Sequence, residues 1–367
     1  MKIDSPTFLS ETTFVSASVQ FSSGSQKFGN TTDDTHQFTG SADFGGNVTV
    51  KSNFVPRGAL NSSTSNVVIG QGAYDNGTPG HRNVVIGQNA AGGATMADVD
   101  DNVFLGYNAG ANVTTTYYNV AIGPSALYSN KTGHSNTAIG YRALYTEGAR
   151  GSNVAIGHQA LQYQSGSSGI AANNTAVGAN AGEAVTTATR LVLVGSGAGR
   201  VITTGGSSTM VGWRAGYSTT TGGYNTFLGN YAGNTNTTGY DNVAIGVETM
   251  YGGTVALDNV AVGNGALYYI GITAAAGNSV GVGNGAGKYA TGSFNTFVGS
   301  AAGLGGTTSA PYSSGKNNTA LGYKALTAFT TGNYNIAVGY EAGDAISTTV
   351  GTVSIGSFAL GGISTTG

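Results

Sequence analysis

The sequence contains no cysteine, so disulfide bonds and thiolate metal sites are excluded, and packing and hydrogen bonds alone must stabilise the fold. Only 5 of the 367 residues are proline, and only 8% are charged. With a formal net charge of −2, the chain lacks the basic surface that binds nucleic acid or an anionic membrane. We therefore expect no nucleic-acid partner.

No uncharged apolar stretch approaches the roughly 18 residues of a transmembrane helix. Residues 1–14 also lack the basic segment and apolar run of a secretory signal, so we expect neither standard export nor membrane insertion. Glycine is abundant instead, at 63 positions, while hydrophobic residues make up 40% of the chain. An excess of glycine without proline fits neither collagen nor a disordered linker, and it indicates fixed turn positions.

One motif recurs down the chain: Asn, Val or Thr, a variable residue, an aliphatic residue, Gly, two variable residues and Ala. It has 17 copies, and eleven of the sixteen intervals between their glycines are 17 residues long. Asn stands four residues before the glycine in 13 copies, and Ala three after it in 16. This repeat predicts an all-β, parallel β-solenoid of about 17 coils over residues 62–367. The motif glycines are Gly70, Gly87, Gly106, Gly123, Gly140, Gly157, Gly178, Gly195, Gly212, Gly229, Gly246, Gly263, Gly283, Gly299, Gly322, Gly339 and Gly356.

Each coil is expected to contain one short strand, formed by the motif itself. Val154 and Ile156 should point to one face of such a strand and Ala155 to the other. We expect Val and Ile to fill the coil interior. The middle position is also mostly apolar, and a strand that is apolar on both faces is buried on both. The second face should therefore meet identical chains about a symmetry axis.

Residues 1–61 lie outside the repeat. Residues 15–21 alternate between apolar and polar types, and residues 38–50 resemble a second, glycine-punctuated pair of strands. We interpret residues 1–61 as a small β module that caps or attaches the solenoid. Four longer intervals are expected to insert outward loops near residues 93–101, 164–172, 267–276 and 305–316.

The segments at residues 136–144 and 153–161 resemble the repeats of the YadA-type trimeric adhesin head, a left-handed parallel β-roll. They resemble still more closely the repeats of phage tail fibres and related virion appendages. Residues 21–41 are similar to the start of fibre proteins from phages of marine cyanobacteria. The resemblance implies a homotrimeric structural protein of a phage virion, synthesised in the host cytoplasm. It also implies attachment to other virion proteins through residues 1–61 and binding of host cell-surface polysaccharide.

Coils of 17 residues are longer than those of adhesin heads, so larger turns are expected here. Bacterial adhesins of that class need a signal peptide and a membrane-anchoring barrel, and we expect neither in this chain. Phage fibres often end in a self-cleaving chaperone domain, which the resemblance implies was removed or replaced by a distal partner. The alternatives are a bacterial surface adhesin or filament subunit, a polysaccharide depolymerase tailspike, and an ice-binding solenoid. Threonine ladders at one offset would favour ice binding, whereas we expect the threonines to be scattered through turns.

Residues at the same offset in adjacent coils should lie one strand spacing apart. Aromatic residues recur one and five positions after the motif glycine, which predicts the stacked pairs Tyr128/Tyr145, Tyr251/Tyr268 and Tyr323/Tyr340. Such rings can stack on sugar faces, or they can simply stabilise the sheet and the seams of a trimer. The candidate glycan-binding residues are Tyr141, Arg142, Trp213, Arg214, Tyr323, Lys324 and Tyr340.

Three acidic groups are candidates for carboxylate catalysis or metal binding: Asp241 with Asp258; Asp98, Asp100 and Asp101; and Asp33, Asp34 and His36. Nothing else converges on any of them, so solvated turns and a polar loop tip are the favoured interpretations. The glycine-rich segments 195–199 and 283–287 are copies of the repeat and no phosphate loops. We expect no enzyme activity, no cofactor and no metal.

Overall fold

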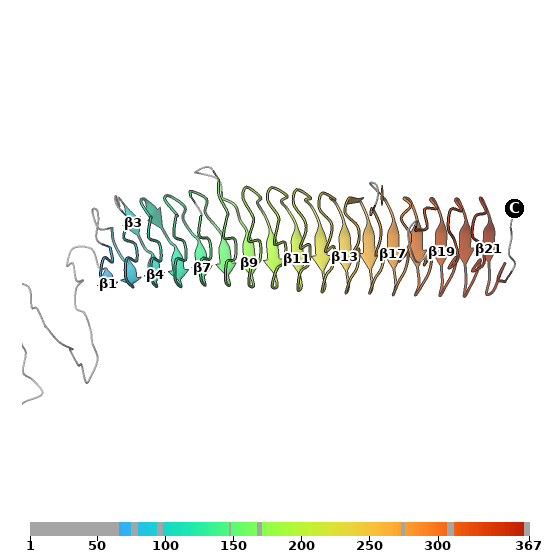
Figure 1. Cartoon of the computed structure of the whole chain (residues 1–367), viewed down its shortest axis with the longest axis horizontal. Helices are drawn as coiled ribbons and strands as arrows, with labels where there is room; N and C mark the ends of the chain where they lie inside the picture. The colour runs from blue at the N-terminus through green and yellow to red at the C-terminus, as the bar shows by residue number, and fades with distance from the viewer. Residues whose placement is uncertain are drawn as a thin grey trace, which may run out of the picture. The chain divides into compact units, whose positions relative to one another are not determined.

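The computed structural model describes residues 66–74, 80–93, 98–146, 148–166, 171–272, 276–306 and 312–362. Over these ranges the chain is all-β and winds as a parallel β-solenoid, as predicted (Figure 1). No helix in these ranges is long and apolar enough to cross a membrane. The expected N-terminal β module of residues 1–61 lies outside the described residues.

One three-residue strand per coil builds a single 17-stranded parallel sheet. At a spacing of about 4.8 Å, its strands span about 80 Å along the solenoid axis. The strands are β1 (Val67–Ile69), β2 (Val84–Ile86), β4 (Val103–Leu105), β6 (Val120–Ile122), β7 (Thr137–Ile139), β8 (Val154–Ile156), β9 (Thr175–Val177), β10 (Val192–Val194), β11 (Thr209–Val211), β12 (Thr226–Leu228), β13 (Val243–Ile245), β15 (Val260–Val262), β17 (Val280–Val282), β18 (Thr296–Val298), β19 (Thr319–Leu321), β20 (Ile336–Val338) and β21 (Val353–Ile355).

Each strand pairs with the equivalent residues of the next coil, even across the longer intervals. Ala155 of β8 pairs with Ala176 of β9, although 21 residues separate the two. Two small parallel pairs lie outside the main sheet: β3 (Val99–Asp100) with β5 (Thr116–Tyr117), and β14 (Ala256–Leu257) with β16 (Ala276–Gly277). The insertions therefore leave the register of the main sheet unchanged.

The middle residue of each strand points into the coil. Ala155 is fully buried, whereas Ile156 is 36% exposed and Val154 is half-buried. The prediction that Val and Ile fill the interior is therefore wrong: the alternation was right, but the two faces are exchanged. The physical reason lies in the turn that follows the strand, since Ala160 and Leu161 are also fully buried and leave room only for a small residue opposite them.

The interior keeps its volume by pairing large with small residues. Where the middle residue is Phe104 or Phe227, the residue four after the motif glycine is Gly110 or Gly233, and a Cβ atom there would lie 2.5 Å from the phenyl ring. Where the middle residue is alanine, that position is often leucine, as in Ala155 and Leu161. Protein interiors are close-packed, and these coils fill a similar cross-section in two different ways.

Buried asparagines four residues before the motif glycine connect successive coils. The backbone N–H of Asn83 donates to Oδ1 of Asn66 at 2.8 Å, and the N–H of Asn102 donates to Oδ1 of Asn83 at 2.9 Å. Ser208 and Ser279 replace asparagine in two coils, and their Oγ atoms accept from the N–H groups of Asn225 at 3.1 Å and Asn295 at 3.2 Å. Because a buried amide without a partner costs about 1–3 kcal/mol, this asparagine ladder explains why the position varies so little.

A pair of neighbouring substitutions tests the corrected strand orientation. Ala155→Asp should place an unpaired charge in the interior and destabilise the solenoid by about 4 kcal/mol or more. Ile156→Asp should leave the coil folded, because its side chain lies on the outer face. Circular dichroism of the two variants checks the prediction; loss of the β signal in Ile156→Asp but not in Ala155→Asp would reverse the orientation.

Candidate functional site

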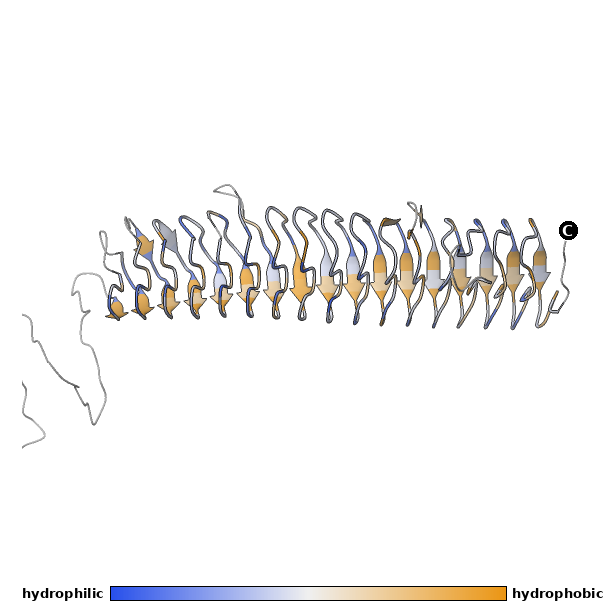
Figure 2. Ribbon diagram, viewed as in Figure 1, coloured by the Kyte–Doolittle hydropathy of each residue, from blue (hydrophilic) through white to orange (hydrophobic). Residues whose placement is uncertain are grey.

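Every strand of the main sheet ends with Val, Ile or Leu, and the strands end in hydrophobic colours along the solenoid (Figure 2). We call the outer surface of this sheet the outer sheet face; it is formed by the first and third residues of each strand. Ile69 is 50% exposed at one end and Ile355 is 69% exposed at the other. Further exposed members are Leu105, Ile156, Val192, Leu228, Val260, Val282, Leu321, Ile336 and Val353.

The sequence had suggested a different set of residues for this surface. Ala121, Ala138, Ala155, Ala244, Ala261 and Ala337 were expected to form an exposed patch, but all of them are fully buried in the coil interior. The unpartnered surface is therefore made of larger Val, Ile and Leu side chains. A monomeric protein rarely exposes a contiguous apolar patch above a few hundred Å².

The stacked aromatic pairs predicted from the repeat are confirmed. The ring centroids lie 4.9 Å apart in Tyr128/Tyr145, 5.1 Å in Tyr251/Tyr268 and 5.3 Å in Tyr323/Tyr340. These rings belong to a surface that we call the aromatic edge, formed by residues one, two and five positions after the motif glycine. Since the rings stack on one another along the axis, part of each aromatic face is already occupied.

The basic candidate residues lie over the candidate rings. The guanidinium of Arg142 is 5.2 Å from the ring centroid of Tyr141, and that of Arg214 is 4.9 Å from Trp213. The Lys324 ammonium is 5.2 Å from the Tyr323 centroid. Each contact is a cation–π interaction, typically of about 0.5–1 kcal/mol at an exposed site.

The seven candidates do not form one site. They fall into three groups in separate coils: Tyr141 with Arg142, Trp213 with Arg214, and Tyr323 with Lys324 and Tyr340. Trp213 is 44% exposed. With Arg214, Arg200 and Tyr217, it lines a small hollow of about 110 Å³. This group combines an aromatic ring, cations and a concave surface.

A continuous run of rings, which begins on the aromatic edge and extends beyond it, was not predicted from the sequence. Tyr231 is 4.6 Å from Trp213 and 5.6 Å from Tyr251, and Tyr269 is 4.2 Å from Tyr312. The rings occupy different offsets, and Tyr312 follows an insertion. A search for equal offsets therefore could not find them, although the density of tyrosine between residues 213 and 312 was a visible signal.

Threonines form a ladder on another side of the coil, which corrects the expectation that they are scattered through turns. Four successive coils carry a Thr-Thr pair eight and nine residues after the motif glycine. The first hydroxyl of each pair donates to the next coil; Thr203 Oγ1, for example, lies 3.2 Å from the carbonyl oxygen of Thr220. The second residues, Thr187, Thr204, Thr221 and Thr238, are exposed.

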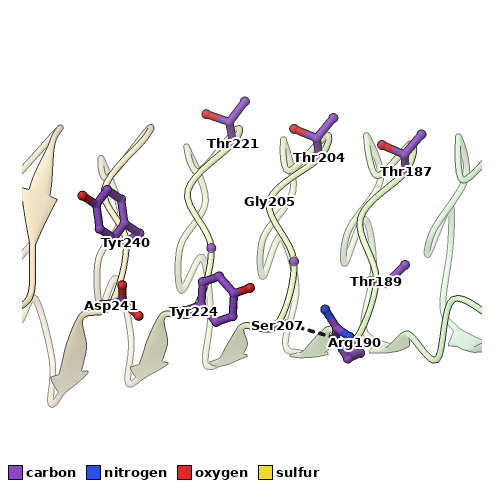
Figure 3. A pocket seen from close by; sticks show the side chains of 12 residues that line it. Thr187, Thr189, Arg190, Thr204, Gly205, Ser207, Thr221, Tyr224, Tyr240 and Asp241 are labelled. Carbon is purple, nitrogen blue, oxygen red and sulfur yellow. Dashed lines mark hydrogen bonds between the residues drawn. The ribbon is translucent and has the colours of Figure 1, made fainter.

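Beside this ladder lies an open groove of about 570 Å³ (Figure 3). We call it the polar groove. Thr187, Thr204 and Thr221 stand in a row along one side. The other side is formed by Arg190, Ser207, Tyr224, Tyr240 and Asp241, and the floor is rich in glycine.

Two of the acidic candidates accept hydrogen bonds from protein groups, and the others belong to no metal-holding cluster within the described chain. Asp101 forms an ion pair with Arg82 at 2.6 Å, and this bond lowers the pKa of the Asp101 carboxyl. Asp100 Oδ1 accepts the backbone N–H of His81 at 2.5 Å. Asp241 and Asp258 occupy neighbouring coils, as expected. The described part of the chain contains no cluster of three or more His, Asp or Glu residues able to hold a metal; Asp33, Asp34 and His36 lie outside it.

The aromatic run should make the protein sensitive to high pH. Burial, followed by the charge of Glu248, raises the pKa of Tyr268 from 10.0 to about 12. The folded state therefore favours the neutral phenol, and this contribution to stability is complete below pH 10 and lost as the pH rises through about 12. Tyr268→Phe should lose less stability over that interval than the parent chain. Thermal unfolding of both proteins at stepped pH measures this; parallel losses would contradict it.

Comparisons with known protein families, with curated proteins and with solved structures give no match to this chain.

Proposed function

We propose that this chain is a structural protein of a phage virion, a homotrimeric fibre that contributes to host attachment. The outer sheet face carries this proposal, because it leaves apolar side chains exposed from β1 to β21. A partner that covers this face must present contacts with the same spacing as the strands, over a sheet of 17 strands. Another copy of the chain in parallel register has that spacing.

A rotation axis parallel to the solenoid would bring equivalent outer positions to the same height in each copy. Such closed association is the common form of homo-oligomers. Three copies are favoured by the resemblance to trimeric adhesin heads and phage fibres. The same resemblance supports a place on the virion, with residues 1–61 joining other virion proteins.

The first test is the oligomeric state of the full chain. Light scattering at micromolar concentration should give the mass of three 36.5 kDa chains. Leu228→Asp should shift the protein towards folded monomer, because it places equivalent charges together on the apolar interface. Thr132→Asp, on an exposed turn, should leave the mass unchanged. A folded monomer of the parent chain would refute the fibre proposal.

Host attachment is proposed to include weak binding of host polysaccharide at the aromatic edge. The hollow beside Trp213 supports this, because an exposed indole ring lies next to two arginines there. A single shallow stacking site should have a Kd near 1 mM, and three chains can increase the apparent affinity by avidity.

Substitution of the tryptophan tests this second element. Trp213→Ala should weaken binding on an array of host polysaccharides, whereas Tyr107→Ala, at the same offset in another coil, should not. Unchanged binding by a trimeric Trp213→Ala variant would discard the site. Release of shortened oligosaccharides would instead indicate a depolymerase.

A further inference from the structure

We propose that the polar groove is a second carbohydrate site, which takes a linear oligosaccharide lying along the solenoid axis. The proposal rests on the host-attachment role given above, but it concerns a different surface from Trp213. Four observations carry it: the hollow itself, the backbone amides in its floor, the donors on its walls and the two tyrosines at one end.

The groove lies over the last three of five successive coils that have small residues six positions before the motif glycine. In these three coils the residues are Thr189, Gly206 and Gly223. The same offset carries large or charged residues in other coils, among them Asp100, Tyr117, His134 and Lys316. The hollow therefore lies in a stretch of coils where this offset carries only small residues.

The floor presents backbone N–H groups that lack a protein acceptor. In three other coils the amide at this offset donates to a side chain one coil further on, as from His81 to Asp100 Oδ1 at 2.5 Å and from Lys316 to Asn333 Oδ1 at 2.7 Å. In further coils of the described chain, such as those of Gly151 and Tyr240, it donates no hydrogen bond. In the groove, the residues one coil after Thr189 and Gly206 are Gly206 and Gly223. Neither glycine has a side chain that could accept a hydrogen bond from the preceding amide. Within the described chain, the amides of Thr189, Gly206 and Gly223 donate no hydrogen bond.

The carbonyl groups of the same floor residues are, by contrast, already used. The N–H of Ser207 donates to Thr189 O at 2.9 Å, and the N–H of Tyr224 donates to Gly206 O at 3.0 Å. The floor therefore offers donors repeated at about 4.8 Å, the spacing of the coils. It suits a ligand with a row of oxygen acceptors. An extended peptide fits less well, because its own N–H groups would face donors.

The walls add the groups that an oligosaccharide needs. The hydroxyls of Thr187, Thr204 and Thr221 can donate to or accept from sugar hydroxyls. Arg190 donates through Nε to Ser207 Oγ at 3.0 Å, which holds its guanidinium against the groove. Tyr224 and Tyr240 are exposed and supply rings for the apolar face of a sugar.

A side chain that another coil of this solenoid carries at the same offset can be used to close the groove. Asn333 shows that asparagine at this offset accepts the amide of the preceding coil. Gly223→Asn should therefore cap the Gly206 amide and fill the hollow. Ser293→Asn places an asparagine at the same offset outside the groove and serves as the control. Thr204→Val with Thr221→Val removes two wall hydroxyls at nearly constant shape, which guards against misfolding in Gly223→Asn.

The experiment uses the full chain on an array of linear neutral and linear acidic bacterial oligosaccharides, with mass measured in parallel. We expect linear oligosaccharides to bind the parent and Ser293→Asn, and to bind Gly223→Asn and the double Thr→Val variant about tenfold more weakly, the factor that one or two lost contacts give. The inference is overturned if no linear oligosaccharide binds the parent, or if binding persists in a folded Gly223→Asn variant. Because the mass reports trimerisation separately, failure of the groove and failure of the fibre proposal are distinguishable.

Discussion

The close approach of successive coils is the constraint on which the rest of this structure depends. The motif glycines have φ near +135°, as at Gly70 and Gly87, in a region that L side chains rarely adopt. A Cβ atom on Gly70 would also overlap the carbonyl of Gly87 in the next coil. Since every coil stacks on its neighbour at the distance of a hydrogen-bonded strand, only glycine satisfies both conditions. This requirement fixes the period of the sequence and hence the alignment of all other positions.

Once that alignment is fixed, residues at the same offset from the motif glycine lie side by side in successive coils and form continuous surfaces. The same argument produces the buried asparagine ladder, the aromatic edge, the threonine ladder and the outer sheet face. A repeat structure can thus carry a different chemistry on each side of a narrow cross-section. The polar groove lies where one such side carries only small residues, over Thr189, Gly206 and Gly223.

The sequence predicted the architecture and the stacked tyrosine pairs because both follow from offset alone. It did not predict which strand face is internal. Val, Ala and Ile are all apolar, and alternation separates the two faces of a strand without showing which of them is buried. A usable signal was present: Phe104 is matched by Gly110, whereas Ala155 is matched by Leu161, as expected for residues that share one interior. The polar groove and the run from Trp213 to Tyr312 were missed because they depend on differences between coils.

The asparagine ladder has one missing rung. The side chain of Leu191 has no oxygen that could accept a hydrogen bond from the following coil. The buried backbone N–H of Ser208 therefore lacks the side-chain acceptor that the N–H groups of Asn83 and Asn225 have. In a stack where each coil contacts only its neighbours, resistance to tension along the axis is set by the weakest junction. The junction between β10 and β11 lacks this one hydrogen bond, so it should resist separation of the coils less than a junction that has it, and it lies within the stretch of coils that forms the polar groove.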